Sequence, residues 1–399
     1  MKILILTFYY PPDLSAGSFR AAALVRALIE AGGGALRIDV VTTAPNRYST
    51  HKVEAPASER QGQVSVRRFS LPRHKSGMVD QALAFSAFAS QVALWSAGKR
   101  WDLVVATSSR LMTAVLGASV AGIARAPLYL DIRDLFPDTM DDLLRGRASH
   151  RLLPVLRRLE RWAVGRATRV NVVSEGFLPY MQAVAPRHDF RTFSNGIDDE
   201  FLEADFTPAT TTAARLPLVL YAGNIGEGQG LQVFLAEAAA RCEGRARFRV
   251  VGDGGRRAAL LESLEARGVG NVEVLDALPR ERLLKHYREA DVLFLHLNDH
   301  PAFTKVLPSK IFEYAVTGRP ILAGVAGNPA RFIEQHVPGA EVFAPCDAVG
   351  LATALGRLLD GPRFVDRTDF RERFSRRRIM HDMAVDVLRT AEPKTEVSR

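Results

Sequence analysis

The chain of 399 residues has a formal net charge of +9 at neutral pH, with 47% hydrophobic residues, 24% charged residues and two cysteines. It is too long for one ordinary hydrophobic core, and its composition is that of a globular protein, so we expect two domains of similar size. Cys242 and Cys346 lie far apart and lack the spacing of a metal site, which favours reduced thiols in apolar surroundings.

The N-terminal segment MKILILTFYYPP is apolar up to Tyr10 and then reaches two prolines. It is too short for a secretory signal with its cleavage site. No other segment has about 18 uninterrupted apolar residues, the length that spans a bilayer. We therefore predict a cytoplasmic protein without a transmembrane helix, a prediction that still allows attachment to a membrane surface.

In the first half of the chain, short apolar runs alternate with segments of helical length and spacing. The runs that predict strands cover residues 2–8, 37–43, 64–71, 102–108, 126–132, 169–175 and 191–196. The segments that predict helices cover residues 17–31, 78–97, 110–124, 150–165 and 175–184. This alternation indicates βαβ units around a mostly parallel sheet.

The segment 143–169 concentrates positive charge, because it holds eight arginines and one acidic residue, Glu160. Apolar residues and Trp162 are interleaved with the arginines. Nucleic acid, anionic lipid and phosphate-bearing substrates all attract such a segment, and the alternative is a helix whose arginines are merely solvated. Because no nucleic-acid-binding signature accompanies it, we favour a lipid surface and expect no nucleic-acid partner.

Residues 206–217, rich in Thr, Ala and Pro, predict a linker between an N-terminal domain, 1–205, and a C-terminal domain, 218–369. After the linker, strands are predicted at 218–225, 247–254, 272–278, 292–297, 320–325 and 341–345. A last helix within 370–390 is expected to pack on one of the domains, with the N-terminal domain as one choice, before a polar tail at 391–399. Two doubly wound domains of this kind predict a ligand cleft at the carboxyl ends of their strands.

Two of the predicted strand-end loops have small residues where a ligand could approach the backbone. Gly17 and Ser18 open a helix after the first strand, where backbone N–H groups and the helix dipole favour an anion. The segment YAGNIGEGQGLQVFL, residues 221–235, has four glycines that permit close approach of a ligand to the backbone. In both loops, tight packing alone is the competing explanation.

Two further loops carry charges. Residues 250–262, VVGDGGRRAALLE, resemble part of a dinucleotide fingerprint without its acidic partner, which favours a tight turn with Arg256 as a phosphate contact. Asp131, Arg133 and Asp134 cluster where a buried strand ends, either as ligand contacts or as helix caps. The sequence has no nucleophile elbow, no P-loop and no His-rich pattern, so we expect no metal site.

The segment PSKIFEYAVTGRPIL, residues 308–322, predicts a short helix that ends at a glycine. Its apolar residues form one stripe, and Lys310, Glu313 and Thr317 fall on the other side. Spacing alone leaves two interpretations of Lys310 and Glu313. They form either a solvated ion pair worth about 0.2–0.5 kcal/mol, or two ligand contacts on one helix face.

With these loops in order, the chain resembles the family 4 glycosyltransferases of the GT-B fold. It is most similar to the branch that builds bacterial O-antigen and capsule sugars, typified by N-acetyl-L-fucosamine transferases. The resemblance rests on TFYYPPDLSAGSFRA, DIRDLFPD, VVSEGF and SNGID in the first half, and on YAGNIGEGQGL, VGDGGRR, ADVLFLHL and PSKIFEYAVTGRPIL in the second. It implies an α/β chain of two Rossmann-like, doubly wound domains that face a central cleft, the first of which binds the acceptor.

The resemblance also implies roles for individual residues. Glu313 would accept hydrogen bonds from the ribose hydroxyls of a nucleotide-sugar, and Ser309 and Lys310 would face its diphosphate. Three residues would form the catalytic site: Asp134 and Arg133 would orient the acceptor, and Lys305 would help to stabilise the leaving diphosphate. The remaining donor contacts implied in this way are Gly17, Gly223, Asn224, Gly252, Arg256 and Leu278.

The chain departs from the family pattern at four positions. Lys305 stands where many members have a second glutamate, and Arg133 stands where a histidine is frequent. Asn224 and Gln229 replace an arginine and a lysine of the glycine-rich loop. Neutralisation of the diphosphate is therefore expected from Lys305, Lys310, backbone amides and Arg256.

The implied activity is that of a retaining, metal-independent glycosyltransferase with no cofactor, since the nucleotide-sugar donor is a substrate. It would move N-acetyl-L-fucosamine or a related amino or deoxy sugar from a UDP-linked donor to a polyprenyl-diphosphate-linked saccharide. Arg157, Arg158, Arg161 and Trp162 would attach it to the anionic inner face of the plasma membrane. Two alternatives stay open: a UDP-sugar 2-epimerase of the same architecture and a non-catalytic sugar-nucleotide binding protein.

Overall fold

The structure, a computed structural model, describes residues 1–13, 15–45, 54–72, 78–108, 110–144, 148–206 and 215–392. The chain divides into two compact units. Unit 1 comprises Met1–Asn195 and Arg377–Arg399, and unit 2 comprises Gly196–Arg376. Residues 145–147 of the arginine-rich segment, 207–214 of the predicted linker and 393–399 of the predicted tail lie outside the described residues.

Unit 1 is built on an eight-stranded sheet of order β3-β4-β2-β1-β5-β6-β7-β8. All neighbouring strands are parallel except β3 and β4, which form an antiparallel hairpin. The central strands are buried apolar runs, as expected for a sheet covered on both faces. The strands are β1 (Lys2–Thr7), β2 (Arg37–Thr43), β3 (Ser58–Gln61), β4 (Val64–Phe69), β5 (Leu103–Ser108), β6 (Leu128–Ile132), β7 (Arg169–Val172) and β8 (Phe190–Thr192).

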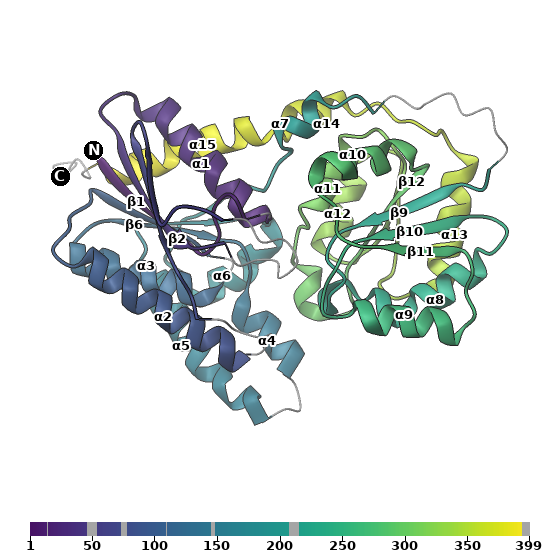
Figure 1. Cartoon of the computed structure of the whole chain (residues 1–399), viewed down its shortest axis with the longest axis horizontal. Helices are drawn as coiled ribbons and strands as arrows, with labels where there is room; N and C mark the ends of the chain where they lie inside the picture. Colours follow the sequence, from purple (N-terminus) through teal and green to yellow (C-terminus); the bar gives the residue numbers. More distant parts are fainter. Residues whose placement is uncertain are drawn as a thin grey trace. The chain divides into compact units, whose positions relative to one another are not determined.

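Helices cover this sheet, and α1 and α15 lie beside one another on it (Figure 1). Four residues of α15 are buried against α1 and the sheet: Met380, Met383, Ala384 and Val387. The helices are α1 (Ala16–Gly32), α2 (Met78–Ser96), α3 (Leu111–Ala124), α4 (Phe136–Leu144), α5 (Leu153–Arg166), α6 (Leu178–Val184) and α15 (Arg376–Ala391), with short 3₁₀ helices η1 (Ala148–Leu152) and η2 (Glu175–Phe177).

Unit 2 has a six-stranded parallel sheet of order β11-β10-β9-β12-β13-β14. The chain order reverses between β9 and β12, and open α/β sheets bind ligands at such a switch point. The strands are β9 (Leu218–Ala222), β10 (Arg247–Val251), β11 (Val272–Leu275), β12 (Val292–His296), β13 (Ile321–Gly324) and β14 (Ala340–Phe343).

Helices again flank the sheet of unit 2 on both faces (Figure 1). They are α7 (Asp199–Glu203), α8 (Leu231–Arg241), α9 (Arg257–Ala266), α10 (Arg280–Glu289), α11 (Lys310–Ala315), α12 (Asn328–His336), α13 (Ala348–Asp360) and α14 (Thr368–Arg373), with η3 (Glu227–Gln229) and η4 (Pro301–Thr304). No helix formed by the described parts of the chain is long and apolar enough to cross a membrane.

The doubly wound α/β architecture predicted from the alternation of strands and helices is confirmed. Two local expectations differ from the structure. Residues 196–205, assigned above to the first domain, contribute Ile197 and Phe201 to the core of unit 2. The single helix expected within 370–390 is two helices, because the chain at Ser375 pairs with Ile197 as an isolated β-bridge.

Candidate active site

The loops after β9 and β10 of unit 2 touch through their backbones. A Cβ atom on Gly252 would overlap the carbonyl oxygen of Gly223, so only glycine permits this approach. Two hydrogen bonds join the loops further: Ile225 N–H donates to the Asp253 carbonyl at 2.9 Å, and Arg256 N–H donates to the Ile225 carbonyl at 2.9 Å. Both loops therefore form one backbone surface at the carboxyl edge of the sheet.

The side chains of these two loops satisfy one another. Asn224 Nδ2 donates to Gln229 Oε1 at 2.8 Å, so the two positions where related enzymes carry cations lie side by side and are neutral. Arg256 Nε donates to Glu227 Oε2 at 2.5 Å, and both side chains are partly exposed. The positive charge of Arg256 is thus balanced by a carboxylate of the glycine-rich loop.

Helix α11 places Lys310 and Glu313 next to the glycine-rich loop. Lys310 Nζ lies 2.7 Å from Glu313 Oε2, and its Cε atom lies 3.7 Å from the place where a Cβ on Gly223 would be. The ion pair that spacing allowed is therefore present, but only 16% of the Glu313 side chain is exposed, so it is no solvated surface pair. Thr317, expected on the same side, is instead buried and donates to the Tyr314 carbonyl.

Glu313 is an ionised carboxylate in a nearly buried position. Burial acts to raise its pKa, but the positive charges of Lys310 and Arg280 hold the pKa below its ordinary value. Tyr287 O–H donates to Glu313 Oε2 at 3.2 Å, and a guanidinium nitrogen of Arg280 lies 3.8 Å from Glu313 Oε1. Asp198 pairs in turn with Arg280 and with Arg376, at 3.0 Å from Arg376 Nη1.

Sequence reasoning missed Arg280 and Tyr287. Arg280 is one of four Arg and Lys residues in α10, and Tyr287 is one apolar position of that helix, so neither is distinguished by pattern. The remaining predicted residues of unit 2 lie in loops after strand ends. Leu278 follows β11 and packs against the core, Lys305 follows η4 and is half-buried, and Ser309 is the residue before α11.

In unit 1, Arg133 lies against the first turn of α1. A Cβ on Gly17 would overlap Arg133 Nη1, so the two predicted residues are in direct contact. The helix begins with a side-chain cap, in which Ser15 Oγ accepts from Ser18 N–H at 3.2 Å. The loop after β6 therefore positions the guanidinium of Arg133, which packs against Gly17 in the space that a side chain there would fill.

Asp134 is a half-buried carboxyl at the start of α4. Burial raises its pKa from 3.8 to about 6, against the effects of the Thr139 hydroxyl, 3.4 Å away, and of Arg133. It lines a small enclosed cavity of about 10 Å³ together with Glu160 of α5. Burial raises the pKa of Glu160 to about 7, and Tyr180 O–H donates to this carboxyl at 2.6 Å.

Asp131, grouped above with Arg133 and Asp134, has a structural role. Its carboxylate accepts from Arg20 Nε and Nη2, both at 2.9 Å, and from Asn171 Nδ2 at 2.7 Å. Arg20 and Asp131 are each 1% exposed. Burial acts to raise the pKa of Asp131, and the charge of Arg20 overcomes it and lowers the pKa. The buried pair ties α1 to β6 and offers no surface to a ligand.

Helix α5 presents the predicted membrane patch on one face. Arg157, Arg158, Arg161 and Trp162 are exposed and line a shallow depression of about 600 Å³ with Pro154. The other face of the helix, which carries Glu160, is buried. Arg157 also pairs with Asp141 of α4 at 2.6 Å. Leu152 and Val155 next to the patch are each more than half exposed.

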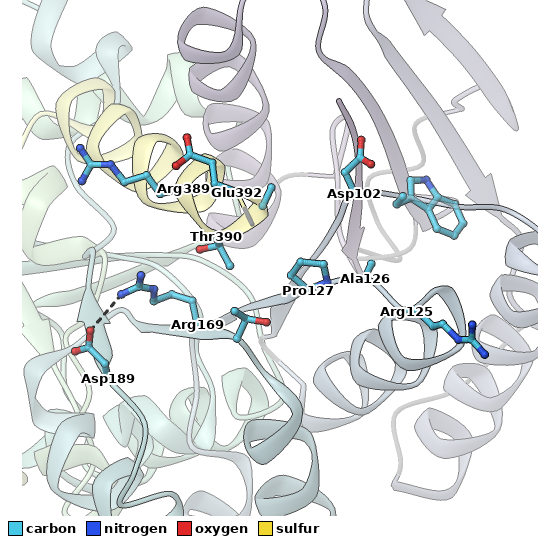
Figure 2. A pocket seen from close by; sticks show the side chains of 12 residues that line it. Asp102, Arg125, Ala126, Pro127, Arg169, Asp189, Arg389, Thr390 and Glu392 are labelled. Carbon is cyan, nitrogen blue, oxygen red and sulfur yellow. Dashed lines mark hydrogen bonds and ion pairs between the residues drawn. The ribbon is translucent and has the colours of Figure 1, made fainter. Parts of the chain in front are cut away.

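A larger depression of unit 1 lies at the amino ends of β5, β6 and β7, opposite to the carboxyl ends that carry Arg133 and Asp134 (Figure 2). It has a volume of about 750 Å³ and mixes acidic and basic side chains, with Arg169 pointing to Asp189 (Figure 2). None of the predicted site residues lines it. Within the described residues, no group of three or more His, Cys, Asp or Glu side chains is placed to hold a metal ion.

Comparison with known proteins identifies both halves of the chain. Residues 17–196 match the family described as glycosyl transferase 4-like domain, and residues 216–361 match the family described as glycosyl transferases group 1. WcaI of Escherichia coli, named as a colanic acid biosynthesis glycosyl transferase, is 25% identical over 88% of this chain and 89% of its own length.

Two further similarities cover different extents. The alpha-D-kanosaminyltransferase of Streptomyces kanamyceticus is 27% identical over 54% of this chain, a match that spans only 57% of that protein. The solved structure of HepE from Anabaena in complex with UDP-glucose is 17% identical and has a TM-score of 0.70, covering 98% of this chain and all of that one. At that identity, the structural match shows the fold. The chain belongs to the glycosyltransferases of the GT-B fold, with a 4-like N-terminal domain and a group 1 C-terminal domain.

Proposed function

We propose that this glycosyltransferase moves a sugar from a UDP-linked donor to a polyprenyl-diphosphate-linked saccharide, with retention of configuration and without a metal ion. The observation that carries the donor half of this proposal is the Lys310–Glu313 pair of α11 beside Gly223. A nearly buried, ionised carboxylate next to a cation and a glycine surface suits two ribose hydroxyls followed by a diphosphate. HepE, which shares the fold, was solved in complex with UDP-glucose.

On donor binding, the ribose hydroxyls would donate to Glu313, and Lys310 would turn from Glu313 toward the phosphates. Arg256 would likewise exchange its partner Glu227 for a phosphate oxygen, and Lys305 would add a third positive charge. Glu313 would keep Arg280, 3.8 Å away, and gain the ribose hydroxyls, and Glu227 is 38% exposed, so neither carboxylate would become an unpaired buried charge. Gly223, Gly252, Asn224, Ser309 and Leu278 complete the proposed donor contacts in unit 2.

In the transfer itself, the bond between the anomeric carbon and the diphosphate oxygen breaks, and a bond from the acceptor hydroxyl oxygen to the same face of that carbon forms. The proton of the acceptor hydroxyl passes to the leaving phosphate oxygen. Lys305, Lys310 and the backbone amides of the glycine-rich loop would stabilise the charge that develops on the diphosphate. Asp134 and Arg133 would orient the acceptor.

We propose a lipid-linked acceptor in the synthesis of a surface polysaccharide such as O-antigen or capsule. The colanic acid assignment of WcaI supports this class of product. The exposed arginines and Trp162 of α5 support attachment to an anionic membrane, at the inner face of which such an acceptor is found. N-acetyl-L-fucosamine or a related amino or deoxy sugar is the proposed cargo, on the sequence resemblance alone.

A panel of nucleotide-sugars tested by thermal stabilisation checks the donor. We expect UDP and UDP-sugars to raise the unfolding temperature more than GDP or CMP compounds. The best donor is then incubated with and without a polyprenyl-diphosphate-linked acceptor. Transfer that requires the acceptor supports the proposal. Interconversion of the UDP-sugar without acceptor would show an epimerase, and binding without turnover would show a binding protein.

A further inference from the structure

Three consecutive carbonyl groups of the glycine-rich loop are hydrogen-bonded by the end of β12. The Glu227 carbonyl accepts from Asn298 Nδ2 at 2.8 Å, and the Gly228 carbonyl accepts from Asn298 N–H at 2.9 Å. The Gln229 carbonyl accepts from His296 Nδ1 at 2.6 Å. The carbonyl groups of all three η3 residues are therefore held by His296, the last residue of β12, and by Asn298, two residues beyond it. Strand β12 is the neighbour of β9 at the switch point.

His296 is fully buried, and both of its ring nitrogens are engaged. Because Nδ1 donates to a carbonyl, Nε2 carries no proton and accepts from Cys346 N–H at 2.9 Å. Burial lowers the pKa of His296 to about 4, so the ring is neutral at physiological pH. It also stacks on Phe234, with ring centroids 4.1 Å apart. The ring thus has one tautomer and one orientation.

Asn298 packs tightly against Gly230 of the glycine-rich loop. Gly230 has a φ of +64°, and a Cβ there would lie 2.8 Å from Asn298 Cγ, so the position requires glycine for both conformation and space. Asn298 Oδ1 accepts from Asp299 N–H at 2.9 Å and lies 3.4 Å from Cys346 Sγ. The amide is held so that its NH₂ group points at the loop.

We infer that His296 and Asn298 are positioning residues that hold the glycine-rich loop in the shape that receives the diphosphate of the donor. This inference rests on the proposed function and deepens it. Asn224 and Gln229 bring no positive charge to the loop, so its backbone must contribute more of the binding. Backbone donors bind an anion well only when their arrangement is fixed in advance, since ordering a loop on binding costs affinity.

Core packing is the competing explanation, because both side chains are at least nine-tenths buried. The two explanations differ in what a substitution affects. A packing role predicts lower stability with the affinity for nucleotide unchanged. A positioning role predicts weaker binding of the diphosphate, a smaller effect on the monophosphate, and faster hydrogen exchange in the loop.

Two conservative variants separate these outcomes. His296→Phe keeps an aromatic ring on Phe234 and removes both hydrogen bonds, and Asn298→Leu keeps a similar volume, adds no charge beside the loop and removes the donor to Glu227. Leu355→Ala of α13 is the matched control for lost packing, since Leu355 is 1% exposed in the core of unit 2 and its apolar side chain makes no hydrogen bond to η3. All are tested in the full chain, by calorimetry with UDP and UMP and by amide hydrogen exchange.

We expect each loop variant to bind UDP at least about tenfold more weakly and UMP within about threefold of the wild type. Amides 226–230 should exchange faster in both variants and not in Leu355→Ala. If His296→Asn, which retains a donor toward Gln229, recovers part of the UDP affinity, the positioning role is supported further.

Wild-type affinity for UDP in both loop variants, or an equal loss in Leu355→Ala, would overturn the positioning role while leaving the donor assignment intact. A wild-type protein that binds UDP no better than other nucleotides would overturn the proposed donor class, and with it this inference.

Discussion

Arg133 Nη1 occupies the space where a side chain at position 17 would begin, so Gly17 and Arg133 form a single fitted contact. Gly17 lies in the first turn of α1 and Arg133 in the loop after β6, and their contact cannot be seen in the sequence. The guanidinium of Arg133, beside Asp134, can keep its orientation only while residue 17 has no side chain. A substitution at Gly17 should therefore displace the Arg133 side chain.

Gly17→Ala tests this contact. Because the clash is with the end of a flexible side chain, we expect the variant to fold with an unfolding temperature near that of the wild type. The displaced guanidinium should lower the rate of sugar transfer by about tenfold or more, as should Arg133→Ala. The double variant should be no slower than the slower single variant, since residues in contact do not act additively. Independent, multiplying losses in a transfer assay would contradict the coupling.

Glu313→Ala should weaken UDP binding, because the ribose hydroxyls lose a charged acceptor. A hydrogen bond to a charged group is worth about 1.5–3 kcal/mol, or roughly 10- to 150-fold in affinity. Calorimetry with UDP measures this. Glu341→Ala is the control, as Glu341 pairs with Arg357 at 2.7 Å on the surface. Unchanged UDP affinity in a folded Glu313→Ala protein would show that Glu313 does not bind the ribose and serves only as the ion-pair partner of Lys310.

Lys310→Ala and Lys305→Ala should lower the affinity for UDP more than that for UMP. The reason is that the neutral Asn224–Gln229 pair leaves the neutralisation of the second phosphate to other cations. The ratio of the two dissociation constants, measured at one salt concentration, is the readout. A wild-type ratio in both variants would show that another group holds the diphosphate.

Glu160→Gln should stabilise the protein at alkaline pH. The carboxyl has a pKa of about 7 in the fold against an ordinary 4.5, so ionising it while it is buried costs free energy above pH 7. This cost is absent below about pH 4.5, where the carboxyl is protonated in both the folded and the unfolded chain. The variant, which keeps an oxygen for Tyr180, should gain up to about 3 kcal/mol at pH 8.5 and nothing at pH 4.5. Urea unfolding at the two pH values checks the sign, and a less stable variant at pH 8.5 would refute it.

The arginines of α5 should confer salt-sensitive binding to anionic membranes, at about 1 kcal/mol for each basic residue near the surface. We expect the protein to float with anionic liposomes at low salt and to be released as salt rises. Replacing Arg157, Arg158 and Arg161 by Gln should reduce flotation and leave UDP affinity intact. The same replacement of Arg241, Arg245 and Arg267, which are exposed in unit 2, is the charge-matched control. Equal flotation with neutral and anionic lipid would contradict this docking surface.

Most of the fold was predictable because most of its strands are short, mainly apolar runs separated by segments of helical periodicity. The hairpin strand β3 was missed because its sequence, SERQ, has no apolar alternation and is largely exposed. Helix α4 was missed although its apolar residues have helical spacing, because the segment is only nine residues long and its three aspartates suit a loop equally well.

The residues of the candidate site were likewise only partly predictable from the sequence. Gly223 was singled out because it is one of four glycines after a predicted strand. Lys310 and Glu313 were singled out by the family resemblance, since spacing alone left their role open. His296 and Asn298 were not, since a histidine in VLFLHL reads as one more core residue until the loop that it supports is seen. The roles of Arg280 and Tyr287 also depend on neighbours distant in sequence, and the assignment of Asp131 to the same group as Asp134 was wrong because Arg20 lies far away in the chain.

The position of α15 after unit 2 in the chain has a consequence for biosynthesis. Unit 1 is assembled from segments on both sides of unit 2, because Met380, Met383, Ala384 and Val387 complete a core that includes Ile3 and Ile5. Unit 2 is one continuous segment between these two, so all of its residues are synthesised before unit 1 is complete. During synthesis, the first half of the chain therefore exposes an apolar face until α15 has been made. A chain that stopped before residue 377 would contain all of unit 2 but would lack part of the core of unit 1.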